Sequence, residues 1–327
     1  MPEVTVIGDG PAGSAAALAA LDAGSPVTLH SRSIRPRHRV CGEFLSPEFA
    51  RVAEALGVWE RLAAAGPAPI RRMRMRLGSR ELQCSLPPGV YGLSRFCLDA
   101  LLSQAAVERG ARLVHSSPVR NSFPTVVATG RKHASRAPKA ERLFAFKAHF
   151  YGPADDAVEL HFFPGGYAGV SPVENGLTNV CGIARLGRIQ EFAFDFDALL
   201  AAVPSLRERL APLARCWEWI SAGPICPVGL PAGLPVGRYL AGDALAFADP
   251  FTGSGLTSAL ITGRLAGLAA AAAEPVDSYL AACRRAIGPV LRNSAWFRRA
   301  LVSEWAGVLV GLIPPSWLFR LTRPRVG

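Results

Sequence analysis

Three glycines near the N-terminus have the spacing of a phosphate-binding turn. Gly8, Gly10 and Gly13 form a GxGxxG pattern. Such a turn binds a pyrophosphate when a strand precedes it and a helix follows, because free N–H groups and the positive end of the helix dipole face the phosphates. The β-branched residues at 4–7 predict that strand, and the Ala/Leu run at 14–23 predicts that helix. The sequence therefore predicts a dinucleotide-binding βαβ unit.

The predicted second strand of this unit, residues 26–30, ends without an acidic residue. Dinucleotide folds carry Asp or Glu at this place, where the carboxylate binds the ribose hydroxyls. This chain has Ser31 there. A serine hydroxyl can make one such bond more weakly, so Ser31 is predicted as a cofactor contact and weaker adenosine binding is expected.

Cys41 and Gly42 follow an Arg-rich loop that comes directly after the predicted unit. In this position the backbone can reach a cofactor or a substrate, and a thiol can act on either one. The other interpretation is a small buried cysteine that only packs. The seven cysteines form no CxxC pair and no zinc spacing, so no metal site is expected. We expect the cysteines to be reduced thiols in a cytoplasmic protein.

Composition narrows the class of protein. The chain has 327 residues, half of them apolar, and a net charge of +11 that comes almost entirely from scattered arginines. A nucleic-acid interface usually has its basic residues clustered on one face, so we expect no nucleic-acid partner. No signal peptide is expected, and the longest apolar stretch, 305–318, is too short to span a bilayer. Aromatic residues near the C-terminus could cover a pocket or contact a membrane peripherally, namely Trp296, Phe297, Trp305 and Trp317.

The middle of the chain predicts a second, antiparallel sheet. Residues 70–77 alternate Met with Arg, and residues 81–86 return after a Gly-Ser turn, which indicates a hairpin. From residue 144 onward, strand-like runs are separated by Gly, Pro, Asp and Asn. Helices are expected at 47–66, after Arg95, at 196–210 and from residue 256, with short buried strands at 125–130 and 238–241.

Three of these segments together resemble flavoproteins of the p-hydroxybenzoate hydroxylase fold. They are GDGPAGSAAA at 8–17, Arg95 in LSRFCLDALL, and GDALAFADPFTGSG at 242–255. Within that fold, the chain is more similar to the geranylgeranyl reductase and electron-transfer-flavoprotein dehydrogenase-like branch. The residues that carry this closer similarity are VCGEFLSP at 40–47, FFPGGYAG at 162–169 and DPFTGSG at 249–255.

The resemblance implies that the cofactor is FAD. Arg95 would lie against its phosphates or adenosine, Asp243 would bind the ribityl or pyrophosphate region, and 250–256 would pass N–H groups by the flavin pyrimidine. The family's Asp-Gly motif appears here as Thr129-Gly130. The cofactor-binding residues predicted in this way, together with the glycine turn, are Gly8, Gly10, Pro11, Ala12, Gly13, Ser31, Cys41, Gly42, Arg95, Thr129, Gly130, Gly242, Asp243, Pro250, Gly253, Ser254, Gly255 and Leu256.

The expected fold class is mixed α/β. A Rossmann-like FAD-binding domain would comprise residues 1–69, 90–142 and 222–275. An inserted antiparallel-sheet substrate domain would comprise 70–89 and 143–221, and C-terminal helices would occupy 276–327. No second GxGxxG lies in a strand context, so electrons would come from transiently bound NAD(P)H, a partner protein or the substrate.

Several reactions fit such a flavoprotein. Hydride exchange at flavin N5 would reduce or dehydrogenate a carbon–carbon bond, and a C4a-hydroperoxide would make the protein a monooxygenase of an aromatic or polyketide substrate. Halogenation in this fold goes with a Trp-x-Trp-x-Ile-Pro motif, which residues 166–172 lack. The branch resemblance favours the reductase. A flavin-binding protein without catalysis is the interpretation from another class.

Four side chains are predicted to take part in the reaction. The resemblance suggests Cys41 as a proton donor or substrate contact. Tyr167, His149 and His161 lie in predicted strands from which they could reach the substrate, although strand histidines more often have satisfied partners or face solvent. The aromatic and aliphatic residues of this sheet favour a lipophilic substrate, such as an isoprenoid or polyketide.

Overall fold

A five-stranded parallel sheet carries the glycine turn. The computed structural model describes residues 1–34, 36–115, 123–131, 139, 142–248, 250–302, 319, 323 and 324, with the side chains of 295–302 excepted. Parallel strands end at one common edge, so the turns that follow them converge there. The strands, in spatial order, are β16 (Arg238–Leu240), β9 (Thr125–Val127), β1 (Val4–Ile7), β2 (Val27–His30) and β8 (Arg112–Val114).

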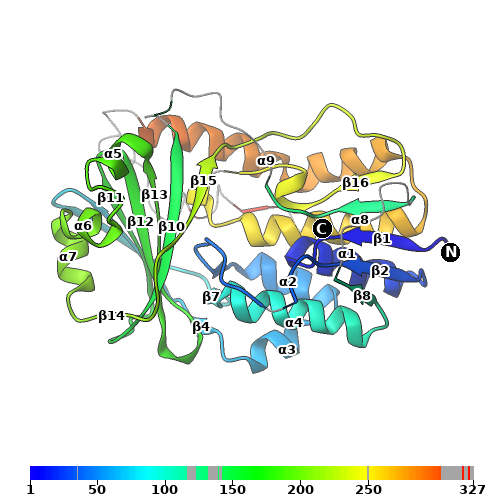
Figure 1. Ribbon diagram of the computed structural model, residues 1–327, viewed down its shortest axis with the longest axis horizontal. Coiled ribbons are helices and arrows are strands. Elements are labelled where there is room, and N and C mark those ends of the chain that lie inside the picture. The colour runs from blue at the N-terminus through cyan, green and yellow to red at the C-terminus, as the bar shows by residue number, and fades with distance from the viewer. Residues whose placement is uncertain are drawn as a thin grey trace.

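Two helices of small residues fix the position of the turn. α1 (Pro11–Asp22) follows it directly, and α8 (Gly255–Ala271) crosses α1 at very short range. A Cβ atom added at Gly263 would lie 2.1 Å from the carbonyl oxygen of Ala12. Glycine is therefore required at this crossing. The close approach of the two helices explains why α8 is rich in glycine and alanine. α4 (Arg95–Glu108) and α9 (Val276–Val302) also pack in this body (Figure 1).

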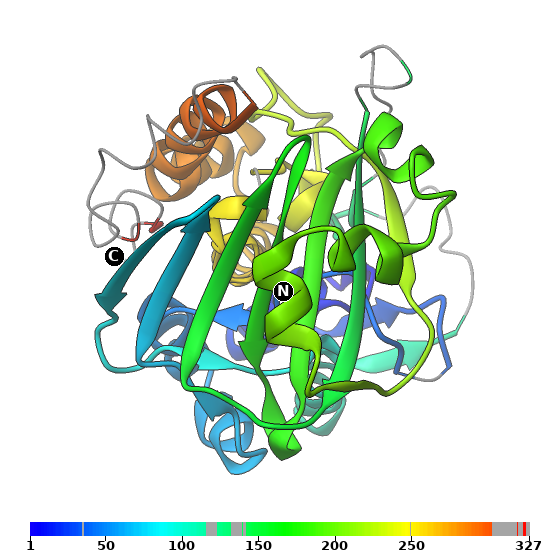
Figure 2. The same ribbon diagram turned by 90° about the vertical axis from the view of Figure 1, so that its left-hand side faces the viewer.

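The second sheet has eight strands and lies beside the first body (Figure 1). The hairpin predicted at 70–86 belongs to it, as expected, but β5 pairs with β11 in parallel rather than antiparallel. One face of the sheet is covered by short helices, α5 (Leu186–Gln190), α6 (Phe196–Ala201) and α7 (Pro204–Leu210), which lie in front of the strands in Figure 2. The strands, in order, are β14 (Ala214–Arg215), β10 (Leu143–Tyr151), β13 (Thr178–Arg185), β12 (Gly166–Pro172), β11 (Ala157–Phe163), β5 (Arg72–Leu77) and β6 (Arg80–Ser85), with β15 (Ile220–Ile225) paired to β10.

Two predicted helices are each divided in the structure. The helix expected at 47–66 is α2 (Pro47–Ala55) and α3 (Trp59–Ala64), separated at Gly57, which has a positive φ of 64°. The helix expected at 196–210 ends before Pro204, whose ring blocks continuation from the preceding turn, so it is α6 and α7. Asp195 caps α6, because its carboxylate accepts a hydrogen bond from the N–H of Ala198.

Three short elements lie between the two bodies. β3 (Phe44–Leu45), β7 (Tyr91–Gly92) and β4 (Ala68–Pro69) form a small sheet that the sequence did not predict. β15 crosses the domain boundary expected at residue 222 and pairs with the large sheet.

The C-terminal region is described in part. α9 covers residues 276–302 of the helices expected there. Trp305 and Trp317 lie outside the described residues, as do the side chains of Trp296 and Phe297. Among the helices that the structure describes, none combines the length and the hydropathy that crossing a membrane requires.

Candidate active site

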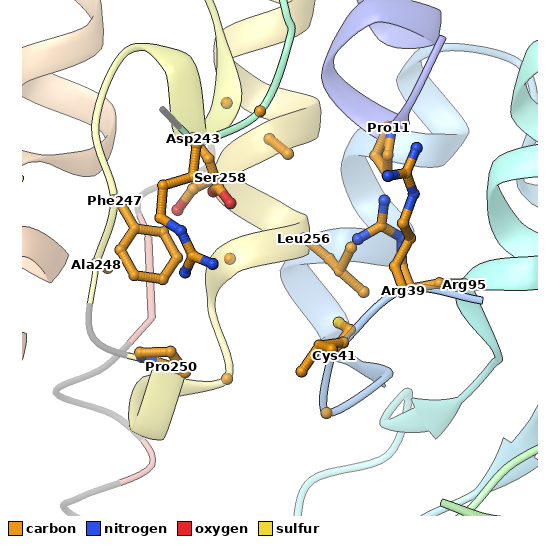
Figure 3. A pocket seen from close by; sticks show the side chains of 18 of the residues that line it. Pro11, Arg39, Cys41, Arg95, Asp243, Phe247, Ala248, Pro250, Leu256 and Ser258 are labelled. Atoms are coloured by element: carbon orange, nitrogen blue, oxygen red, sulfur yellow. The ribbon is translucent and has the colours of Figure 1, made fainter. Parts of the chain in front are cut away.

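A cavity of about 570 Å³ lies between the carboxyl edge of the parallel sheet and the inner face of the large sheet (Figure 3). Small-molecule sites commonly have volumes of roughly 300–1,000 Å³. Of the predicted cofactor-binding residues, Gly13 and Ser254 lie behind the wall of the cavity and the others line it. Segments far apart in the sequence therefore meet at one site.

The glycine turn has the geometry of a phosphate cradle. Gly8 has a φ of 109°, and a Cβ atom there would lie 2.3 Å from the carbonyl oxygen of Ala128. A Cβ atom at Gly13 would lie 1.6 Å from the carbonyl oxygen of Gly8. At Gly10, in contrast, the nearest atom to an added Cβ is Nη2 of Arg95, 3.8 Å away. Gly8 and Gly13 must be glycine because backbone atoms pack closely against them. Gly10 leaves space for a ligand, so the turn fits a dinucleotide pyrophosphate.

Arg95 supplies a fixed positive charge over this cradle. Its guanidinium donates two hydrogen bonds of 2.7 Å to the carboxylate of Asp99, one turn further along α4. Burial would lower the pKa of Arg95, but the Asp99 carboxylate outweighs burial and the pKa is raised. In Figure 3, Arg39 and Arg95 lie together beside Pro11. An anion at Gly10 would thus meet a charge that is already oriented.

The late glycine-rich segment forms the opposite side of the cavity. Figure 3 shows Asp243 and Ser258 across the pocket from Arg95. Gly242 has a φ of 59°, and its N–H donates to Oγ1 of Thr262 at 2.9 Å, so this amide is already used within the protein.

The cavity wall at the beginning of α8 consists of four predicted cofactor-binding residues, Pro250, Gly253, Gly255 and Leu256. Ser254 is fully buried, and its hydroxyl bonds that of Thr252 at 2.7 Å.

Cys41 lies where the two halves of the cavity meet. It is half-buried, and Figure 3 places it below Leu256, on the side that carries Arg39 and Arg95. The N–H of Glu43 donates to its Sγ at 3.3 Å, and Asn179 Nδ2 donates to its carbonyl oxygen at 3.1 Å. Burial raises the pKa of the Cys41 thiol. The thiol therefore keeps its proton more strongly than an exposed cysteine does. Cys41 also lines the cavity.

Behind Cys41 is a buried group of charges that the sequence analysis did not identify. Glu43 accepts hydrogen bonds from Lys147 Nζ, His149 Nε2 and the N–H of Arg95, the last at 2.6 Å. Glu43, Lys147 and His149, called the Glu43 cluster below, are fully buried. Burial would raise the pKa of Glu43, but the hydrogen bond from His149 and the charge of Lys147 outweigh it, so the pKa is lowered. A carboxylate is stable here because its partners surround it.

The sequence held a signal for this cluster. In FAFKAHF the lysine and the histidine are two residues apart, so in a strand they share one face. The other face, with Phe146, Ala148 and Phe150, packs under α6 and α7. Lys147 and His149 must then point toward the cavity side, where a buried lysine requires a carboxylate. Glu43 is that carboxylate, in the segment that includes Cys41.

The structure places the other predicted catalytic residues differently. Tyr167 lines the cavity, and its ring lies 5.8 Å from that of Phe251. His149 lies behind the wall as part of the Glu43 cluster. His161 is on the outer face of the large sheet, because its neighbour Leu160 faces the cavity and side chains alternate along a strand. Its Nδ1 bonds Ser205 Oγ of α7 at 2.9 Å, so the structure does not bring His161 to Cys41.

The two departures from the family pattern also lie at the cavity. Thr129 and Gly130 line it after β9, where the family has Asp-Gly. Ser31 lines it after β2 and is 1% exposed. Its hydroxyl donates to Oδ2 of Asp9 at 2.7 Å, so a carboxylate does lie at the end of β2 although it belongs to the glycine turn.

Comparison with known proteins connects this site to flavin enzymes. No family model matches the chain. It is 28% identical over 321 residues to a menaquinone reductase of Mycobacterium tuberculosis, covering 84% of this chain and 76% of that one. It is 27% identical over 322 residues to digeranylgeranylglycerophospholipid reductase 2 of Methanopyrus kandleri, covering 84% and 78%.

Solved structures show the same fold. A flavin-dependent brominase superposes with a TM-score of 0.81 at 18% identity, covering 98% of this chain and 92% of that one. A geranylgeranyl bacteriochlorophyll reductase-like protein of Thermoplasma acidophilum superposes with a TM-score of 0.72 at 18% identity, covering 98% and 91%. Klebsiella pneumoniae HpxO, complexed with FAD and uric acid, superposes with a TM-score of 0.73 at 15% identity, covering 98% of this chain and 92% of that one.

These similarities confirm two predictions. The chain has the mixed α/β flavoprotein fold, and it is an FAD-dependent oxidoreductase similar to the geranylgeranyl reductase-like branch.

Proposed function

We propose that the chain reduces or dehydrogenates a carbon–carbon bond of a lipophilic small molecule, isoprenoid or polyketide in character, by hydride exchange with FAD. The observation that carries this proposal is the position of the Cys41 thiol. It faces the cavity between the phosphate cradle and the apolar inner face of the large sheet. A protonated thiol at that point can complete a reaction that begins with a hydride.

The residues present would hold FAD along the length of the cavity. Gly8, Gly10 and the first turn of α1 would bind the pyrophosphate, with Arg95 over it. The start of α8 would lie at the pyrimidine ring, where N–H groups stabilise negative charge. Bound there, FAD supplies the hydride chemistry at N5. A transient nicotinamide, NADH or NADPH, is the proposed source of electrons.

Reduction of a carbon–carbon double bond adds one hydride and one proton. The hydride goes to one carbon, and the Sγ–H of Cys41 gives its proton to the other, which leaves a thiolate. The N–H of Glu43 and the charge of Arg95 favour that thiolate, whereas burial and the Glu43 carboxylate oppose it more strongly, so the thiolate regains a proton readily. A proton from water restores the thiol. Dehydrogenation runs the same transfers in reverse.

The substrate side of the cavity is apolar. Alternate residues of β5 and β11 face it, namely Met73, Met75, Val158 and Leu160. Methionine side chains adapt to irregular shapes, which suits a flexible hydrocarbon chain. The names of the similar reductases support this choice, because one of them specifies geranylgeranyl chains, which are isoprenoids.

The proposal is tested by the mass of the product. Purified protein loaded with FAD is expected to be yellow, to bleach anaerobically with NADH or NADPH, and to convert a member of a lipophilic substrate panel into a product two hydrogens heavier. A product one oxygen heavier, formed with oxygen consumption, would show a monooxygenase instead. Yellow protein that no nicotinamide bleaches and that converts no substrate would indicate a flavin carrier.

Replacing Cys41 with serine tests the proton donor. A serine hydroxyl is a far weaker acid than a thiol, so turnover is expected to fall by about 10²-fold, the usual size of general-acid catalysis, with the Kd for FAD unchanged. Single-turnover kinetics of the reduced protein measure this step. Cys84→Ser, in β6 and outside the cavity wall, is the matched control. Equal turnover by the Cys41 variant and the parent would remove the role assigned to Cys41.

A further inference from the structure

The end of β2 poses an electrostatic question. Folds that bind dinucleotides place an acidic side chain here to accept hydrogen bonds from the ribose hydroxyls. Ser31 occupies that place, and a neutral hydroxyl is a poorer acceptor. The glycine turn beside it contains a carboxylate, because Asp9 stands between Gly8 and Gly10.

The structure brings these two unusual residues together. Ser31 is 1% exposed, and its Oγ accepts a hydrogen bond from the N–H of Ser33 at 3.1 Å. Its one proton has two acceptors in reach, and the nearer and charged one is Oδ2 of Asp9, at 2.7 Å against 2.9 Å for the carbonyl of Ser33. The backbone on both sides is fixed, since the N–H of Gly8 donates to the carbonyl of His30 at 2.8 Å and Ser14 Oγ donates to the carbonyl of Asp9 at 3.0 Å. Both residues line the cavity. The Asp9 carboxylate is therefore held at the end of β2, close to where the missing acid would be.

A carboxylate in a phosphate cradle would ordinarily repel the pyrophosphate. Here the bond to Ser31 turns the carboxylate toward β2, whereas the space for a phosphate is at Gly10, beside Arg95. A carboxylate has about four acceptor positions. Among the described residues, the side chain that donates to the Asp9 carboxylate is Ser31, so the carboxylate keeps acceptor positions for ligand hydroxyls.

We propose that Asp9 replaces the missing acid, and that its carboxylate, oriented by Ser31, accepts hydrogen bonds from the adenosine ribose hydroxyls of FAD. This inference rests on the proposed FAD site. It implies selectivity for a dinucleotide whose ribose is not phosphorylated, because a 2′-phosphate would meet the carboxylate. The carboxylate thus comes from the turn, 22 residues before Ser31 in the chain, and reaches the end of the second strand.

The test is the affinity of the apoprotein for FAD and for FMN, which has no adenosine, measured by quenching of flavin fluorescence. Asp9→Asn keeps the shape of the side chain and an acceptor for Ser31. It is expected to weaken FAD binding about 10-fold or more, as loss of a charge-assisted hydrogen bond does, and to leave FMN binding unchanged. Ser31→Ala, which removes the orienting bond and also the hydrogen bond that the N–H of Ser33 donates to Ser31 Oγ, is expected to have a smaller effect in the same direction.

A swap makes the test sharper. Asp9→Ala combined with Ser31→Asp returns the acid to the strand and is expected to recover most of the FAD affinity that Asp9→Ala loses. FAD binding by Asp9→Asn that equals or exceeds that of the parent would show that the carboxylate only repels phosphate, and would overturn the inference. Equal losses for FAD and FMN would also overturn it, because they would indicate a damaged turn. A parent protein that binds no FAD overturns the proposed function itself.

Discussion

Replacing Lys147 with methionine is expected to lower the free energy of unfolding of the apoprotein by about 3 kcal/mol. Glu43 and Lys147 are both fully buried, and removing one member of a buried pair leaves an uncompensated charge, which typically costs about 3–5 kcal/mol. His149 and the N–H of Arg95 continue to bind Glu43, so the lower end of this range applies. Urea unfolding followed by tryptophan fluorescence measures the loss.

An exposed ion pair provides the matched control. Arg61 and Glu108 are partly solvent-exposed, at 35% and 47% of their side-chain surface, and Arg61→Met is expected to change stability by less than about 1 kcal/mol. Adding Glu43→Gln to Lys147→Met removes the uncompensated charge and is expected to restore part of the loss. If Lys147→Met were no more harmful than Arg61→Met, the Glu43 cluster would have no structural importance.

The effect of Lys147 depends on pH in a definite direction. The pKa of Glu43 is lowered in the folded protein from its ordinary value of 4.5, so its pairing stabilises the fold above that pH. As the pH falls through the folded-state pKa, Glu43 becomes protonated and Lys147 loses its counter-charge. The difference in stability between the parent and Lys147→Met is therefore expected to shrink in acid.

The parts of this protein that the sequence predicts are those where local chemistry is sufficient. The glycine spacing of residues 8–13 is typical of a strand before it and a helix after it, and both are present. β1 has the predicted bounds, and α1 begins at Pro11, three residues before the Ala/Leu run that predicted it. Arg95 was predicted at the start of a helix and lies there. In both cases the pattern that identifies the residue also determines the element that positions it.

The parts that were missed depend on contacts between distant segments. Glu43 and Lys147 are 104 residues apart, and each looks like an ordinary charged residue until β10 is placed against the loop that contains Cys41. The pairing of Ser31 with Asp9 was missed for the same reason, although only 22 residues separate them. The sequence of the second strand shows that an acid is absent, but not that the carboxylate of Asp9 lies beside Ser31.

Gly13→Ala is expected to lower the stability of the apoprotein and Gly10→Ala to lower the affinity for FAD, although the two glycines belong to one motif. A Cβ atom at Gly13 would lie 1.6 Å from the carbonyl oxygen of Gly8, and backbone cannot move aside as a flexible side chain can. Overpacking of this kind typically costs about 1–3 kcal/mol and more where backbone must shift, so we expect Gly13→Ala to lower the stability of the apoprotein by at least about 3 kcal/mol.

Gly10 has a φ of −73° and an open site for a methyl group, so Gly10→Ala is expected to leave apoprotein stability within about 0.5 kcal/mol of the parent, as for other substitutions without a steric conflict. The added methyl group would occupy the space assigned to the pyrophosphate, and FAD affinity is expected to fall by about 10-fold or more. Thermal unfolding without FAD and fluorescence titration with it separate the two effects. If Gly10→Ala bound FAD as tightly as the parent does, the pyrophosphate would not lie in this cradle, because a phosphate and a methyl group cannot share that space.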